Sequence, residues 1–484
     1  MLTTLIQKEL KAIILSPKFA ATFAVCSVLL LLSVYTGVRE YRASVEQWEA
    51  AVQLADQQAR EAGGWHGFSY KTLRKPDPMQ IFVSGLSNDV GRWSDISTSN
   101  SVKLRNSSYS DDPIYAVFRF VDFTFIVQIV LSLFAILFTY NAVNGERESG
   151  TLKLVFSNGV PRAKYLVAKC CGAWLGLVVP ISIPVLLSLL IVMLYKIPLT
   201  GVHWARLISL VGVSLLFFSL FVVLGVWMST LTRRSSVSFL ISLVLWVSFV
   251  LILPRAGVMA AGQMVHVPRV AEIEGQRDGY AKDLWGEHYK EMEARWTEAS
   301  CGETGNEAAT DEAMWARMQE EDSLRKGVEK RIEEYEVKLL EDLRRKKRGQ
   351  ERLAFTLARI SPVSAYQLAA MSLAGTDITL KSRYEEAMSD YRERLNEYVQ
   401  RKQAESGDMG GFLNIQIDSE SGVSIGTGRD NPGLDVSDMP RFDPPYITLA
   451  ESVAPIIPDV GILVLGILVS FLGSFIAFLR YDVR

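Results

Sequence analysis

Long apolar runs alternate with strongly charged stretches along this chain of 484 residues. Several runs have about 20 residues, the length that an α-helix needs to cross the hydrocarbon core of a bilayer. We find six of them, at 19–38, 120–140, 174–195, 207–231, 237–253 and 460–479. The pattern therefore predicts an α-helical integral membrane protein with six transmembrane helices. The first run is too long for a removable signal peptide, so we expect it to remain as an anchor.

Basic residues in the short flanking segments predict the orientation. The segments 1–18, 141–173 and 480–484, and the short link before residue 237, fall on one side of a six-span topology. They hold Lys8, Lys11, Lys18, Arg147, Lys153, Arg162, Lys164, Lys169, Arg233, Arg234, Arg480 and Arg484. Positively charged short loops stay in the cytosol. Both termini are therefore predicted in the cytosol, and the two long segments 39–119 and 254–459 outside it.

The larger external segment is expected to be mostly helical. Helix-forming residues dominate 307–359, which at 1.5 Å per residue could extend about 75 Å unless Gly327 or Gly349 kinks it. Shorter helices are expected at 362–373 and 381–403, and together these elements predict an antiparallel, partly coiled-coil arm. Its apolar stripes either pack on each other or bind a partner. The basic run 344–348 follows an acidic stretch and indicates a solvated helix face rather than a nucleic-acid site.

Two further elements complete the soluble part. Leu413, Ile415 and Ile417 alternate with polar residues, which predicts a strand that pairs with 423–425 as a small β element. From 63 to 112 the chain is rich in Gly, Ser and Asn, so loops and short structure are expected there. At the N-terminus, apolar residues recur at helical spacing up to Ile14, and Ser16-Pro17 follow. This pattern predicts an amphipathic helix in the membrane interface, within 1–18.

Signals of catalytic chemistry are missing from the sequence. There is no Walker A pattern, so any ATP hydrolysis has to come from another subunit. The four histidines, His66, His203, His266 and His288, form no metal-binding pair, and Cys170-Cys171 lack metal-ligand spacing. Charge is nearly balanced, with no overall signature of nucleic-acid binding. We expect no enzymatic activity, no metal and no cofactor bound by this chain itself.

The stretch that follows the second apolar run carries the strongest functional signal. It has a charged start, a Gly-Thr turn and an apolar continuation, which suit a short amphipathic helix able to dock on a soluble partner. It resembles the cytosolic coupling element of ABC-2-type transporter permeases, where a glutamate-rich stretch followed by Gly-Thr-Leu contacts the ATPase subunit. The residues that match are Glu146, Arg147, Glu148, Ser149, Gly150, Thr151 and Leu152. A Pro, an Arg and a Lys follow as in the family, although Pro161 directly abuts Arg162 here.

The resemblance implies a permease subunit of an ABC transporter, dimeric through a second copy of this chain or a related permease. ATP and Mg are then expected on a separate cytosolic ATPase subunit, and the work done is either substrate export or movement of the external helices. Ser361 to Ala365 and Leu373 to Asp377 resemble a bacterial subgroup with large extracytoplasmic insertions, often grouped with permeases for multicopper-enzyme maturation. That likeness implies the bacterial inner membrane and allows a periplasmic or outer-membrane partner. The alternative is a membrane scaffold or receptor without an ATPase.

Polar and small residues inside the apolar runs are the remaining candidates. Gln128 lies within the second run, and Arg119 and Asp122 mark its outer end. Intramembrane polar residues are functional candidates, although snorkelling or an Arg119–Asp122 pair explains these two equally well. A GxxxG pair stands at Gly172 and Gly176, and small residues punctuate the last run. Such residues permit close helix contact, either between subunits or within one.

Overall fold

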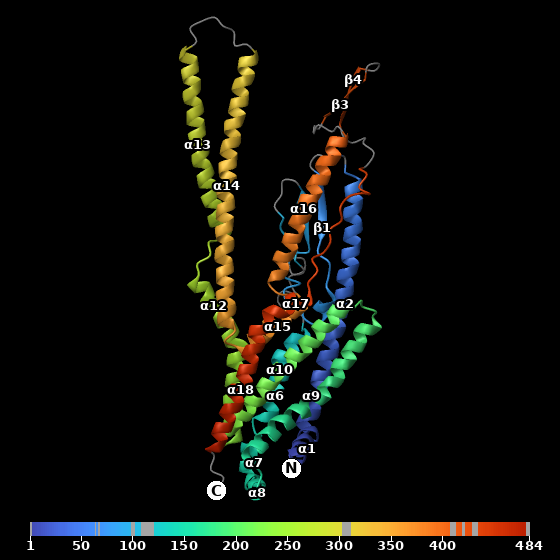
Figure 1. Ribbon diagram of the computed structural model, residues 1–484, viewed down its shortest axis with the longest axis vertical. Coiled ribbons are helices and arrows are strands. Elements are labelled where there is room, and N and C mark those ends of the chain that lie inside the picture. Colours follow the sequence, from blue (N-terminus) through green and yellow to red (C-terminus); the bar gives the residue numbers. More distant parts are fainter. Residues whose placement is uncertain are drawn as a thin grey trace. The chain divides into compact units, whose positions relative to one another are not determined.

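The computed structural model describes residues 2–62, 64–65, 68–97, 102–107, 121–302, 311–406, 413–418, 422–427 and 434–480. The chain forms two compact units, one of residues 1–251 with 361–484 and one of residues 252–360. We refer to them as the bundle unit and the hairpin unit. Helices dominate both units, as the sequence predicts (Figure 1).

Among the described residues, six helical stretches are long and apolar enough to cross a membrane, which confirms the predicted fold class. They are Pro17–Arg60, Phe123–Glu148, Arg162–Leu194, Gly201–Leu231, Ser235–Met264 and Leu449–Leu479. Each contains, or largely covers, one of the apolar runs in the sequence. Two stretches include a π-helical turn, at Ile126–Leu131 and at Ser248–Ile252. Such turns are rare in proteins as a whole, and those that occur are frequently at functional sites.

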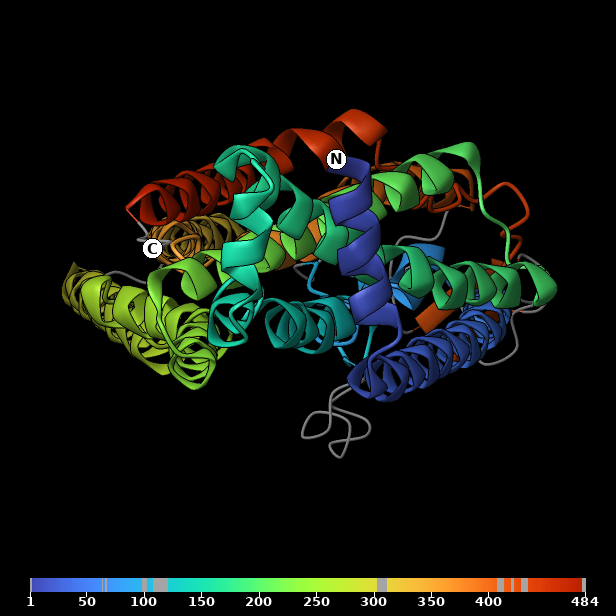
Figure 2. The same ribbon diagram turned by 90° about the horizontal axis from the view of Figure 1, so that it is seen from below.

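Helix α10 (Gly201–Leu231) is the centre of the bundle unit. Its side chains Phe217 and Phe221 are fully buried. Helix α18 (Ile457–Leu479), α15 (Pro362–Ala374), α6 (Ser132–Thr139) and α9 (Arg162–Leu194) all pack on it. In α15, the ring of Tyr366 stacks on Phe217 with 4.6 Å between centroids, and its hydroxyl lies 2.9 Å from Ser214 Oγ. Figure 2 shows these helices from below.

Three of the small residues in the bundle unit, Gly172, Gly176 and Gly473, contact neighbours within the chain. In α9, a Cβ added at Gly172 would lie 2.6 Å from Glu9 Cβ, and Gly176 faces Ile13. Both neighbours belong to α1 (Leu2–Ile14), the predicted amphipathic helix. In α18, Gly473 is in similarly close contact with Trp227 of α10. Close approach without a side chain is what these glycines permit.

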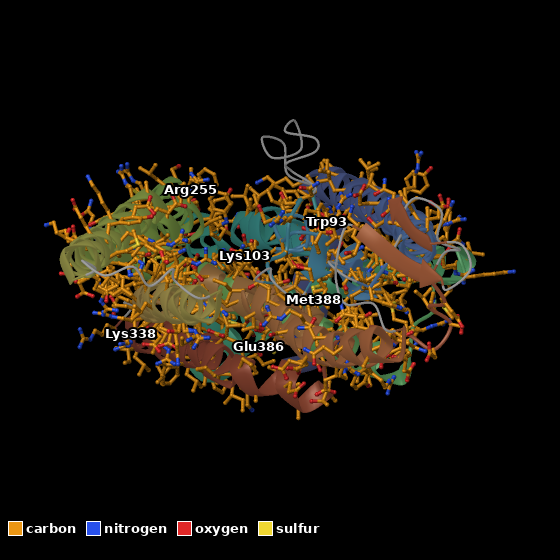
Figure 3. The ribbon with its side chains drawn as sticks, turned by 90° about the horizontal axis from the view of Figure 1, so that it is seen from above. Trp93, Lys103, Arg255, Lys338, Glu386 and Met388 are labelled. Carbon is orange, nitrogen blue, oxygen red and sulfur yellow. The ribbon has the colours of Figure 1, made fainter. Side chains whose placement is uncertain are left out.

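The end of the bundle unit opposite α7 and α8 is built on the long helix α2 (Pro17–Arg60) and on α16 (Thr379–Ser406). Between them lie β1 (Ser69–Leu73) and β2 (Trp93–Ser97), an antiparallel pair, and the 3-10 helix η1 (Pro78–Ile81). Met388 and Tyr391 of α16 are fully buried in the core of this end. Figure 3 looks down on it and labels Trp93 of β2 and Met388 of α16. The sequence predicts only loops and short structure here, because neither strand alternates clearly.

The small β element that the sequence predicts is confirmed. It consists of β3 (Leu413–Asp418) and β4 (Gly422–Thr427), an antiparallel pair in which Ile415 lies opposite Ile425. Near the last span, α17 (Leu449–Val453) and a 3-10 turn (Ala454–Ile456) lead into α18. Thr448 caps α17 and exchanges hydrogen bonds with Glu451.

The hairpin unit consists of α12 (Leu253–Met264), α13 (Val270–Gly302) and α14 (Asp311–Ala358). Helices α13 and α14 run antiparallel: Arg277 pairs with Glu336 at 3.0 Å, and Tyr280 stacks on Tyr335 (Figure 1). Helix α14 runs unbroken through Gly327 and Gly349. The expected external segment 254–459 is therefore not one compact body. Residues from Ser361 onwards belong to the bundle unit, because apolar α15 packs on α10.

Candidate functional site

The stretch identified in the sequence forms two short helices, α7 (Asn144–Glu148) and α8 (Thr151–Ser157). They lie at the same end of the bundle unit as both chain termini (Figures 1 and 2). Gly150 joins them with a φ of 75°, a left-handed conformation that favours glycine. Thr151 Oγ1 hydrogen-bonds Glu146 O at 3.2 Å and lies 2.9 Å from Ser149 Oγ. The Gly-Thr pair of the sequence is thus the turn between the helices.

Glu146 points into the protein and joins three helices. Its Oε1 lies 2.7 Å from Lys8 Nζ of α1 and 2.9 Å from Lys169 Nζ of α9. Its Oε2 accepts a hydrogen bond of 2.6 Å from the Tyr165 hydroxyl. Lys169 is only 5% exposed and also contacts Glu9 Oε1 at 2.7 Å, so one buried ammonium lies between two carboxylates. Burying this charge is favourable only because it is paired on both sides.

Glu148 makes a different contact. Its carboxylate accepts hydrogen bonds from the backbone N–H of Ser235 at 2.8 Å and from Ser235 Oγ at 2.7 Å. Ser235 is the first residue of α11 (Ser235–Val247), where the initial N–H groups have no partner within the helix. A carboxylate at that position satisfies one of them and is favoured by the helix dipole. Glu148 therefore connects α7 to the start of the fifth span.

Asn144 is fully buried at the start of α7 and contacts the end of α10. Ser229 Oγ donates to its Oδ1 at 3.1 Å, and its Nδ2 donates to Thr232 Oγ1 at 3.0 Å. The backbone N–H of Val143 also donates to Ser229 Oγ at 2.9 Å. These contacts position α7 against α10.

The outward side of α8 is what a soluble partner can reach. Leu154 is 65% exposed, and Thr151 and Lys153 beside it are exposed as well. The opposite side of α8 is packed: Leu152 is buried, and Phe156 contacts the rings of Tyr165 and Phe478. Arg162 reinforces this corner by donating to the carbonyls of Phe478 and Leu479 at the end of α18. The exposed Leu154 therefore lies on a helix whose opposite side is packed against α9 and α18.

The seven residues predicted from the sequence point in different directions in the structure. Glu146 and Leu152 face inward, Glu148 faces α11, Arg147 is half-buried, and Ser149 to Thr151 form the exposed turn. The contacts of this stretch were not predicted from the sequence, although Lys169 is the Lys of the family pattern. They involve Lys8, Glu9, Asn144, Tyr165, Lys169 and Ser235. The charge pattern of α1 and the basic residue at 169 are the only signals that could have found them, since the contacts join positions up to 160 residues apart.

The intramembrane candidates do not gather into one site with α7 and α8. Asp122 caps the start of the second span by accepting from Phe125 N at 2.8 Å, and it accepts from Ser84 N and Oγ, both at 3.1 Å. Gln128 lies in the π-helical turn and is 9% exposed. Within the part of the chain that the structure describes, its Nε2 has no hydrogen-bond partner. Arg119 and the suggested Arg119–Asp122 pair lie outside the described residues.

Comparison with known protein families gives one match. A model of the ABC-2 family of transporter proteins matches residues 3–483, which include α1, the α7–α8 pair and all six candidate spans. A comparison with curated proteins found no match.

Proposed function

The chain belongs to the ABC-2 family of transporter proteins, and on this premise we propose that a separate cytosolic ATPase drives this permease subunit through α7 and α8. The observation that carries the proposal is the division of α8 into two sides. One side exposes Leu154, and the other is fixed by Leu152 and the aromatic rings behind it. A partner that pushes on the exposed side moves the helices attached to the packed side.

The contacts of α7 define where such a displacement goes. Glu146 passes it to α1 and α9 through Lys8 and Lys169, while Glu148 passes it to the start of α11. Asn144 connects α7 to α10, the central helix of the bundle unit. A displacement of α7 therefore acts directly on three candidate spans, those of α9, α10 and α11.

The function that follows is ATP-driven rearrangement of the spans. ATP and Mg bind to the ATPase, and a second copy of this chain or a related permease completes the transporter. The rearrangement either exports a substrate or moves the extracytoplasmic helices, which can engage a periplasmic or outer-membrane partner. The membrane is the bacterial inner membrane, with α7, α8 and both termini in the cytosol. A scaffold or receptor without an ATPase is the competing account.

Co-purification of the ATPase with a tagged chain tests the proposal. We expect Leu154→Asp to abolish co-purification, because a buried anchor residue at an interface typically contributes about 2 kcal/mol or more, roughly thirtyfold in affinity. Leu15→Asp is the matched control: Leu15 is 79% exposed and belongs to the short turn after α1. Loss of the ATPase from Leu154→Asp alone supports the proposal. Equal recovery of ATPase with both variants, or no ATPase with the native chain co-expressed with its genomic neighbours, contradicts it.

A further inference from the structure

A small cavity with a cationic lining lies at the Gly201 end of α10, the opposite end from Ser229 and α7. Its volume is about 40 Å³, more than a single water molecule needs. Three chain segments line it: the stretch after β1, the turn between α15 and α16, and the strand-like stretch before α17. The lining residues used below are Arg74, Lys75, Asp77, Thr376, Arg383 and Tyr384.

Positive charge exceeds negative charge in this lining. Arg74, Lys75 and Arg383 are cationic, and Asp77 is the one acidic residue in the lining. One oxygen of the Asp77 carboxylate already has a partner, because Oδ1 accepts a hydrogen bond from Met79 N at 2.8 Å. Arg383 shares its Nη2 between Asp377 Oδ1 at 3.1 Å and Gly375 O at 3.3 Å. The charged residues of the lining together with Asp377 carry a net charge of one positive.

Two buried polar groups of the lining lack partners. Thr376 is 2% exposed, and among the described residues nothing hydrogen-bonds its Oγ1. The same holds for Nε of Arg74, whose Nη2 donates to Ser87 O at 2.6 Å. Burial lowers the pKa of Arg74 from its usual value, yet a guanidinium stays protonated in proteins. Unpaired buried donors are costly, and both residues belong to the cavity lining, so the surroundings favour a ligand rich in acceptor oxygens.

We propose that this cavity binds a phosphate group. A phosphate offers several acceptor oxygens and a negative charge, and it matches the planar donors of arginine and the point charge of lysine. Tyr384 adds no competing anion, because burial raises its pKa to about 12 and its hydroxyl donates to Lys75 O at 3.3 Å. The site is independent of the proposed coupling through α7 and α8.

The position of the cavity indicates the depth in the membrane at which the phosphate binds. Ile447 in its lining lies two residues before the candidate span Leu449–Leu479, and Arg206, on the second turn of α10, donates to the carbonyl of Ile447. The cavity is therefore at the height where a span enters the membrane, which is the level of lipid headgroups. Two sources of phosphate share this chemistry there: a phospholipid headgroup and a free phosphate ion or phosphate ester.

Binding measurements on the full chain separate these sources. In one arm, the chain in an uncharged glycoside detergent is dialysed against labelled orthophosphate. In the other arm, the chain is returned to nanodiscs of phosphatidylglycerol in a phosphate-free glycolipid, re-extracted, and its retained phospholipid is counted by native mass spectrometry. The variants are Lys75→Gln and Arg383→Gln. Lys71→Gln is the matched control, because Lys71 lies over the ring of Trp93 and outside the cavity lining.

We expect both lining variants to weaken binding about tenfold and the control to leave it unchanged. Saturable orthophosphate binding identifies a free phosphate or phosphate ester as the ligand. Retention of phospholipid without orthophosphate binding identifies a headgroup. Lys75→Gln alone decides the result if Arg383→Gln fails to fold, since Lys75 is exposed. Binding that is absent in both arms, or equal in Lys75→Gln and Lys71→Gln, overturns the proposal.

Discussion

At the scale of single residues, Glu146 is the side chain on which the account depends. The family likeness implies that Glu146 contacts the ATPase. In the structure, however, its carboxylate contacts Lys8, Lys169 and Tyr165 of the same chain. Its role is then to hold α7 in place rather than to touch the partner. The sequence identifies the residue but not its direction. Side-chain direction in a five-residue helix depends on packing against elements that are distant in the sequence.

Replacing Glu146 by Gln tests this structural role. The amide keeps the shape but removes the charge, so Lys8 loses its partner and Lys169 keeps only Glu9. We expect a loss of about 1.5–3 kcal/mol in stability, the contribution of a hydrogen bond to a charged group. Thermal unfolding in detergent measures it, with Glu49→Gln in α2 as the control at an exposed position. An unchanged melting temperature for Glu146→Gln would show that the carboxylate is not structural.

At the scale of elements, pattern and length decided what could be predicted. The six spans follow from the length of the apolar runs, and the β3–β4 pair follows from the alternation of apolar and polar residues. Strands β1 and β2 have five residues each, too few for their mixed polarity to stand out. The placement of α15 could not be predicted either. Its apolar residues fit an external helix as well as one packed on α10, and only the partner surface decides.

Close packing of α1 on α9 gives a prediction for the N-terminal helix. Gly172→Leu places a side chain where Glu9 Cβ lies, so α1 has to move and the Glu9–Lys169 pair is strained. Overpacking of this kind costs about 1–3 kcal/mol. The control is Gly212→Leu in α10, where an added Cβ meets no atom within 4 Å among the described residues. Melting temperatures of the two variants should differ, with only Gly172→Leu destabilised. The same melting temperature in both would mean that the α1–α9 contact is loose.

At the scale of the whole molecule, topology is the prediction that joins the parts. Both termini lie with α7 and α8 at one end of the bundle unit, as expected for an even number of spans (Figure 1). The basic flanks of the sequence then assign this end to the cytosol. Orientation relative to the membrane depends on insertion and not on the internal contacts of the fold, so it needs its own experiment.

Cysteine labelling of intact cells tests the orientation. In a background without Cys26, Cys170, Cys171 and Cys301, single cysteines are placed at Leu154 and at Tyr446, which is 72% exposed. We expect a membrane-impermeant maleimide, applied after the outer membrane is opened, to label Tyr446→Cys. Leu154→Cys should react only after the inner membrane is lysed. Labelling of Leu154→Cys from outside would reverse the topology and remove the basis for a cytosolic ATPase.

The most direct test of the account is a crosslink from α8 to the ATPase. Leu154→Cys carrying a maleimide-linked benzophenone is irradiated in membranes that contain the co-expressed ATPase, beside Leu15→Cys as the control. We predict a covalent adduct between this chain and the ATPase from position 154, and none from position 15. A stable, labelled chain that forms no adduct from position 154 would contradict coupling through α8 and favour a scaffold or receptor.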